Sequence, residues 1–156
     1  MDDLDRRILA ILQRDATLPV ERIAQMVNSS KSPVWSRIRK LREAGIIDRQ
    51  VAILNPAKVD QDEVFFVTIK TSSHSKNWLE RFAAAIATMD EVQEAHRLAG
   101  EIDYVLKVRV RDTRAFDAFY KRLVAEVDLF SVTSSLSMET LKETTVIPLD
   151  DDHADD

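Results

Sequence analysis

The sequence predicts an α+β protein, with an N-terminal winged helix-turn-helix followed by a ferredoxin-like βαββαβ domain. Through residue 44, apolar residues recur at helical spacing, whereas from residue 63 alternating apolar stretches are interleaved with two amphipathic ones. Between these halves, residues 55–62 are polar and begin with Asn-Pro, which is typical of a linker. We therefore expect a first domain at 1–54, a linker at 55–62, a second domain at 63–149 and a disordered acidic tail at 150–156.

Three short helices are expected in the first domain. The first covers Leu4 to Arg14 and begins among aspartates, whose carboxylates cap free N–H groups. The second covers Pro19 to Val27, since proline is favoured at a helix start. The third covers about Ser32 to Ala44 and ends at Gly45, where a helix terminus favours a left-handed residue. Two short apolar runs around a polar centre at 46–54 predict a small hairpin, or wing.

The second domain is expected to contain a four-stranded sheet and two helices. The helices are expected at 75–89 and 113–127, with Ser75 and Asp112 as their N-terminal caps. The strands are expected at Val64–Lys70, Val92–Leu98, Ile102–Val110 and Val132–Met138.

Composition limits the possible functions. The formal net charge is −5, but residues 1–55 carry 10 Lys/Arg against 7 Asp/Glu, and the remainder carries 12 against 20. This asymmetry suggests two modules with different partners. The chain has no cysteine, and its three histidines are widely separated, so neither a metal nor a cofactor is expected. The acidic N-terminus and the short apolar runs favour a cytoplasmic protein without a signal peptide or membrane span.

The third helix is the candidate DNA-reading element. Its expected inner stripe is Val34, Ile38 and Leu41, which leaves basic and hydroxyl side chains on the other sides. In a helix-turn-helix this helix enters the major groove of double-stranded DNA. Trp35 is expected to pack at the edge of the core or against the wing, with a contact to a base as the alternative. The expected phosphate contacts are Lys31, Arg37, Arg42 and Arg49, and the expected base contacts are Ser32, Ser36, Arg39 and Lys40.

Three segments of the chain resemble the Lrp/AsnC (leucine-responsive, or feast/famine) transcription regulators. They are Leu4-Asp5-Arg6-Arg7-Ile8-Leu9, Leu41-Arg42-Glu43-Ala44-Gly45-Ile46-Ile47 and Gly100-Glu101-Ile102-Asp103-Tyr104. The resemblance extends over residues 2–149 and implies a DNA-binding domain followed by an effector domain. It also implies homodimers formed by packing sheets, which assemble into tetramers or octamers. Small effectors, typically amino acids, would bind between subunits near Gly100. Asn28 stands where the family often has glycine, and asparagine also tolerates a left-handed conformation.

The hairpin around Gly100 is the candidate effector site. Glu101, Asp103 and Tyr104 flank the glycine, and a carboxylate suits an α-ammonium group while glycine N–H groups suit an α-carboxylate. The alternative is a plain hairpin whose acids cap the turn or form salt bridges, with Tyr104 in the core. On the following strand, a row of basic residues either pairs with acids or faces solvent: Lys107, Arg109 and Arg111.

These features favour an effector-responsive, sequence-specific transcription regulator over an enzyme. One alternative is a tetrapyrrole (siroheme-type) decarboxylase of similar two-domain architecture, for which His74, His96 and Arg97 would be the candidate residues. A second alternative is a chromatin-organising protein that binds DNA with little sequence preference. The regulator and the chromatin-organising protein could share the same fold, so they differ in the ratio of specific to non-specific DNA affinity rather than in their structural elements.

Overall fold

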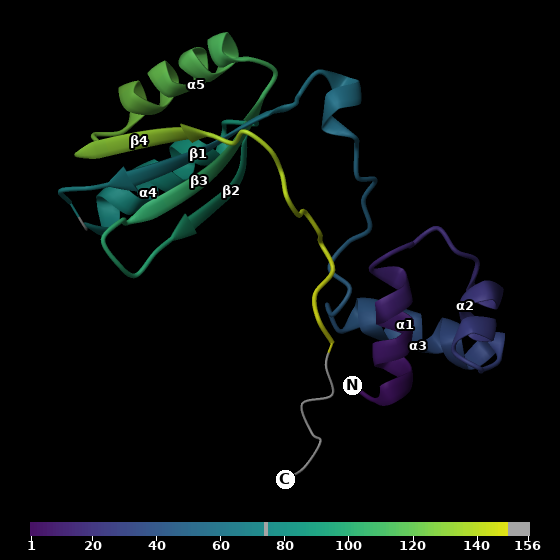
Figure 1. Ribbon diagram of the computed structural model, residues 1–156. Coiled ribbons are helices and arrows are strands. Elements are labelled where there is room, and N and C mark those ends of the chain that lie inside the picture. Colours follow the sequence, from purple (N-terminus) through teal and green to yellow (C-terminus); the bar gives the residue numbers. More distant parts are fainter. Residues whose placement is uncertain (74, 150–156) are drawn as a thin grey trace. The chain divides into compact units, whose positions relative to one another are not determined.

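A computed structural model describes residues 1–73 and 75–149, which form two compact units (Figure 1). The first unit is Met1–Ala52 together with the segment that begins at Lys142, and the second is Ile53–Leu141. His74 and the expected acidic tail at 150–156 lie outside the described residues. None of the helices in the described part of the chain is long and apolar enough to cross a membrane.

The first unit contains the three expected helices: α1 (Asp3–Leu12), α2 (Val20–Met26) and α3 (Lys31–Glu43). A capping box starts α1, because the Asp2 carboxylate accepts from the Asp5 N–H at 3.0 Å and the Asp5 carboxylate accepts from the Asp2 N–H at 3.1 Å. The buried residues that join the three helices are small or aliphatic: Ile8, Ile23, Ala24, Val27, Val34 and Ile38.

The two turns of this unit have the expected backbone conformations. Asn28, between α2 and α3, has φ +52°, and Gly45, after α3, has φ +70°. The chain reverses at Gly45 through hydrogen bonds from the N–H groups of Ile46 and Ile47 to the Leu41 carbonyl, at 2.9 and 3.1 Å. A β-carbon at Gly45 would meet nothing within 4 Å, so backbone conformation, rather than lack of space, favours glycine there.

The expected wing is not formed. The described residues 46–54 contain no strand, and Val51 and Ile53 are exposed. A strand needs a hydrogen-bonded partner, and no segment of the described chain pairs with this one. The expected linker contains a short 3₁₀ helix, η1 (Pro56–Val59), which the Asn55 side chain caps by accepting from the Ala57 N–H at 3.1 Å.

The second unit is a four-stranded antiparallel sheet in the order β2-β3-β1-β4, with the βαββαβ element order that the sequence predicts. Its strands are β1 (Glu63–Lys70), β2 (Val92–Arg97), β3 (Tyr104–Val110) and β4 (Ser131–Leu136). Its helices, α4 (Lys76–Ala87) and α5 (Thr113–Glu126), begin at the expected caps Ser75 and Asp112.

Both helices cover one face of this sheet. The core between them is aromatic, with Trp78 and Phe82 from α4 and Phe119 from α5 packed against the strands. The rings of Trp78 and Phe82 stack at 5.1 Å, and the indole N–H donates to the Asp128 carbonyl at 2.9 Å. The opposite face of the sheet carries the polar side chains of the strands, which alternate with the buried ones.

The chain returns to the first unit after the sheet. Sequence reasoning placed the end of the second domain at 149, whereas the compact units divide between Leu141 and Lys142. The reason is a two-way contact within the first unit: the Gln13 amide donates to the Ile147 carbonyl at 3.1 Å and accepts from the Ile147 N–H at 2.6 Å. This pair ties the returning segment to the end of α1.

Candidate nucleic-acid interface and effector hairpin

The side of α3 opposite its buried stripe is polar and accessible. Val34, Ile38 and Leu41 are buried, as the helical spacing predicts. Four residues at spacing i, i+3, i+4 and i+7 share the other side and form what we call the outward face of α3: Ser32, Trp35, Ser36 and Arg39. The Lys40 side chain is exposed beside this face and has no hydrogen bond or ion pair with the described residues.

Most of the other expected phosphate contacts have acidic or amide partners in the structure. Lys31 forms an ion pair with Glu21 of α2, and the Arg42 guanidinium donates to the Gln50 amide oxygen at 2.8 Å. Arg49 lies 4.0 Å from the neighbouring Asp48 carboxylate, and both side chains are largely exposed. Exposed ion pairs of this kind contribute little to stability and exchange readily for a phosphate partner.

Arg37 occupies a different environment from the other basic residues. Its guanidinium pairs with Asp2 and lies 3.2 Å from the Asp5 carboxylate, so it clamps α3 to the start of α1. The Asp5 N–H, followed by the Arg37 guanidinium, lowers the pKa of Asp2, and the same contact with Asp2 raises the pKa of Arg37. Sequence reasoning gave Arg37 a phosphate, but the structure gives it two carboxylates of the same unit.

Trp35 does not pack where sequence reasoning placed it. The expectation was the edge of the core or the wing, but the residue is 51% exposed and no wing is formed. Its ring contacts Arg39, whose guanidinium carbon lies 5.0 Å from the ring centroid. The indole therefore belongs to the outward face of α3.

The hairpin at 98–103 is tied to the end of β1. The Leu98 N–H donates to the Asp103 carbonyl at 2.8 Å, and the Asp103 N–H donates to the Ile69 carbonyl at 3.0 Å. The Asp103 carboxylate accepts from the Thr71 N–H at 2.8 Å. Asp103 therefore fixes the hairpin against the segment that follows β1, and Thr71 is a contact that sequence reasoning missed.

Glu101 and Lys70 form an ion pair across this hairpin, with Nζ 2.8 Å from the carboxylate. The lysine lowers the pKa of Glu101 by donating to its charged form. A β-carbon at Gly100 would meet nothing within 4 Å, so the backbone there is open to a ligand. Sequence reasoning also missed Lys70, because its proximity to Glu101 depends on the pairing of β1 with β3.

Tyr104 points away from the hairpin into the core. It is only 6% exposed, and its ring lies 5.5 Å from Trp78 and 4.9 Å from Phe82. The structure thus separates it from the exposed Glu101 and supports the core alternative stated for this residue. Tyr104 is therefore not part of the candidate effector site.

The basic row on β3 pairs with neighbouring polar groups. Lys107 lies 3.3 Å from Glu94, and Arg109 donates to the Gln93 amide oxygen at 2.9 Å. His96 also contacts Glu94, at 3.4 Å, and together with Lys107 it lowers the pKa of that carboxyl. Among the described residues, no group of His, Asp and Glu side chains has a metal-binding arrangement.

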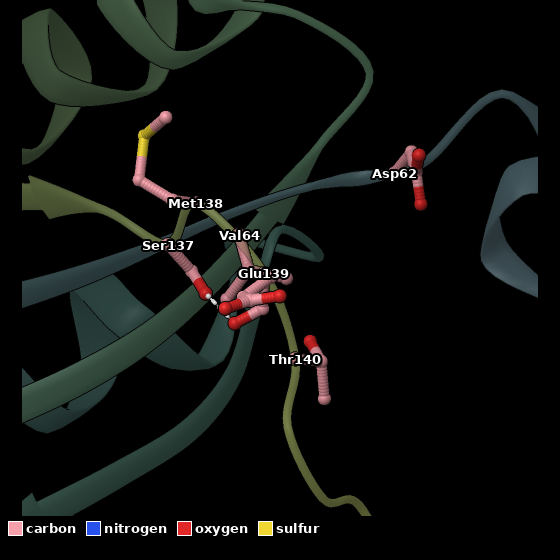
Figure 2. A pocket seen from close by; sticks show the side chains of 6 residues that line it. All are labelled: Asp62, Val64, Ser137, Met138, Glu139 and Thr140. Carbon is pink, nitrogen blue, oxygen red and sulfur yellow. Dashed lines mark hydrogen bonds between the residues drawn. The ribbon is translucent and has the colours of Figure 1, made fainter.

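Figure 2 shows a hollow of about 290 Å³ that is lined by residues next to the start of β1 and the end of β4. By the strand registers, this is the opposite end of the sheet from the hairpin. Asp62, Ser137, Glu139 and Thr140 line it with polar groups, and Ser137 donates to the Glu139 carbonyl at 3.1 Å. Its two carboxylates have no basic side chain beside them in the lining. The hollow has two carboxylates and no positive charge for the carboxylate of an amino acid, whereas the hairpin has Lys70 beside Glu101, so the hairpin remains the candidate effector site.

Comparisons with known proteins match the helical part and the sheet part of the chain to two separate domains. The chain matches the AsnC-type helix-turn-helix domain over residues 1–42 and the Lrp/AsnC ligand binding domain over residues 64–147. It is 43% identical over 151 residues to the DNA-binding transcriptional activator DecR of Escherichia coli K12, covering 96% of this chain and 99% of that one.

Two solved structures have the same fold. An AsnC family transcriptional regulator from Agrobacterium tumefaciens is 48% identical with a TM-score of 0.93, over 96% of this chain and 97% of that one. A transcriptional regulator from Neisseria meningitidis, solved as a complex with L-methionine, is 31% identical with a TM-score of 0.91 over the same shares. With both domains matched and the two-unit architecture shared, the chain belongs to the Lrp/AsnC family of transcriptional regulators.

Proposed function

We propose that this chain is a sequence-specific regulator that binds double-stranded DNA through α3 and responds to an amino acid at the Gly100 hairpin. The observation that carries the proposal is the outward face of α3. It presents two hydroxyl groups and a guanidinium beside the accessible Lys40, on the third helix of a helix-turn-helix. The relatives named above are regulators rather than enzymes, which supports a regulatory rather than a catalytic role.

The proposed DNA contacts fall into two groups. Ser32, Ser36, Arg39 and Lys40 are the proposed base contacts, since they lie on or beside the outward face. Lys31, Arg42 and Arg49 are the proposed phosphate contacts at its margins. Arg37 is a positioning residue in this scheme, because its pairing with Asp2 and Asp5 sets how α3 lies against α1.

The effector is proposed to bind where Glu101 and Lys70 meet. An amino acid carries one positive and one negative group, and this ion pair offers an opposite charge to each. The backbone N–H of Gly100, an exposed residue, is proposed as a further donor to the carboxylate, and Asp103 holds the hairpin in place. The complex of the Neisseria relative with L-methionine supports an amino acid as the ligand class.

The working assembly is proposed to be a homodimer that associates further into tetramers or octamers. Phe66 is exposed on the sheet face that the helices leave uncovered, and the apolar side chains of Val51 and Ile53 are exposed before it. A dimer with twofold symmetry would bind an inverted repeat. Light scattering on the purified protein measures the assembly directly, and a monomer at micromolar concentration would contradict this part of the proposal.

The DNA-binding function is tested by selecting duplexes from a random pool with the full chain. The selected and random duplexes are then titrated at fixed salt, because the phosphate contribution varies with salt. Arg39→Ala should reduce discrimination by about 1–3 kcal/mol, whereas Arg42→Ala should weaken binding to both duplexes alike. Equal losses on both duplexes for both variants would contradict the division between base and phosphate contacts.

The effector site is tested by thermal shift with each of the twenty amino acids. A ligand that binds the folded state raises the melting temperature, and Glu101→Gln should reduce that rise at the same ligand concentration. Glu139→Gln, in the acidic hollow, is the matched control and should leave the shift unchanged. A shift abolished by the control and kept by Glu101→Gln would place the ligand elsewhere.

A further inference from the structure

Trp35 is an exposed aromatic residue in the middle of a polar surface. It follows Ser32 by three residues and precedes Arg39 by four, so its side chain lies between theirs on one side of α3. The other tryptophan of the chain, Trp78, is buried. At 51% exposure the indole leaves much of its apolar surface accessible to water, so a partner that covers this surface would gain free energy by burying it.

Arg39 is held from two directions by its own helix. The indole of Trp35 lies against its guanidinium at 5.0 Å, a cation–π distance. The Glu43 carboxylate lies 3.5 Å from its Nε, one helical turn further along. The contact at Nε leaves the two terminal amino groups for another acceptor, and a guanine offers O6 and N7 to such a pair.

We propose that Trp35 determines specificity by contacting the 5-methyl group of a thymine beside the guanine that Arg39 binds. This role rests on the proposed DNA-binding function of α3. Because the two side chains touch, the two bases they contact must be neighbours. Each half of the binding site should therefore contain a thymine and a guanine within one base step of each other, and both side chains would contribute to recognising that step.

The chemistry of the major groove favours a methyl group as the partner of this ring. Thymine is the only common DNA base that presents a methyl group there, and apolar side chains recognise it by contact. The hydroxyl groups of Ser32 and Ser36 are short, so they let the helix approach closely enough for the larger indole to reach a base edge. A phosphate would instead require a charged or hydrogen-bonding group, and the neighbouring Arg39 and Lys40 supply those.

The test uses the full chain and the duplex that the wild-type protein selects from a random pool. Each thymine is replaced in turn by deoxyuridine, which lacks only the 5-methyl group, and affinities are measured by fluorescence anisotropy. At one thymine in each half-site, the wild-type protein should lose about fourfold in affinity, the factor for one buried methyl group. Trp35→Ala should bind the thymine and deoxyuridine duplexes equally, and Trp35→Phe should keep part of the difference.

A second substitution separates a direct contact from an effect through Arg39. Replacing the neighbouring guanine by 7-deazaguanine removes one acceptor, and Arg39→Ala should be insensitive to that change while remaining sensitive to the thymine methyl. If Trp35→Ala alters only the response to 7-deazaguanine, Trp35 merely positions Arg39 and the proposal is wrong. A selected site without this thymine, or no methyl effect at any position, would also overturn it. If the wild-type protein selects no sequence at all, the proposed function itself fails.

Discussion

The two tryptophans show how differently the two units use aromatic surface. Trp78, in the sheet unit, is 8% exposed, stacks on Phe82 and donates its indole N–H to the Asp128 carbonyl. Trp35, in the helical unit, lies outside a core whose buried residues include no aromatic side chain. Its ring contacts the Arg39 guanidinium on the same helix. In the sheet unit aromatic residues form the core, whereas in the helical unit the aromatic residue lies on the surface.

The units also differ in how charge contributes to their structure. The sheet unit has an extensive aromatic and aliphatic core, and its ion pairs lie on its surface. The helical unit is small, and its helices α1 and α3 are joined partly by Arg37 with Asp2 and the buried Asp5. Its stability should therefore depend more on pH than on any single ring.

The largest expected effect is the loss of a core ring from the sheet unit. Phe119 is fully buried, so Phe119→Ala should lower the free energy of unfolding by about 3–5 kcal/mol. Trp35→Ala, the matched aromatic deletion in the helical unit, should change it by no more than about 0.5 kcal/mol. Urea unfolding followed by circular dichroism measures both. Comparable losses would mean that Trp35 is part of a core.

A smaller, pH-dependent effect is expected at Asp2. Its pKa is lowered in the folded state from the ordinary value of 3.8, so its charged form stabilises the unit above that pH. This contribution should be lost as pH falls through the lowered pKa. Asp2→Asn isolates the charge, because asparagine can still cap α1. The stability difference between wild type and Asp2→Asn, measured by hydrogen exchange of α1 amides, should shrink below about pH 4. A difference that does not vary with pH would show that neither the Asp5 N–H nor the Arg37 guanidinium favours the charged form of Asp2 in the folded state.

The smallest expected effect concerns the segment that returns to α1. Gln13→Ala removes both hydrogen bonds to Ile147, each of which contributes about 0.5–1.5 kcal/mol to stability. The Ile147 amide should therefore exchange its hydrogen faster in this variant than in the wild type. Arg14→Ala is the control, because Arg14 bonds the Ala10 carbonyl of its own helix. Unchanged protection in Gln13→Ala would mean that other contacts hold the segment.

Local patterns were sufficient to predict most of the fold. The caps Ser75 and Asp112 and the left-handed residues Asn28 and Gly45 are where the sequence places them, because each depends only on neighbouring residues. The cap of α1, Asp2, is one of the aspartates expected at its start. Alternation and helical spacing likewise predict the βαββαβ order of the second unit. The prediction of a wing at 46–54 was wrong, because a strand depends on a hydrogen-bonded partner that a local pattern cannot reveal.

The candidate site was harder to predict, because its contacts join residues far apart in the chain. Arg37 is 35 residues from Asp2, and helical spacing gives no information on such a pair. Lys70 meets Glu101 only through strand register. Within the outward face, Trp35 is the residue whose helical position is nearest the buried stripe, so spacing alone fits either a core position or an exposed one. Its exposure follows from how α1 and α2 cover α3.

The most direct test of DNA binding by the outward face of α3 compares the two tryptophans by fluorescence. Trp78→Phe leaves only Trp35, and Trp35→Phe leaves only Trp78. Adding the selected duplex to the first variant should change the emission of Trp35 and protect it from quenching by acrylamide, while Trp78 in the second variant should show neither change. Binding that alters Trp78 and leaves Trp35 open to the quencher would contradict the proposed interface.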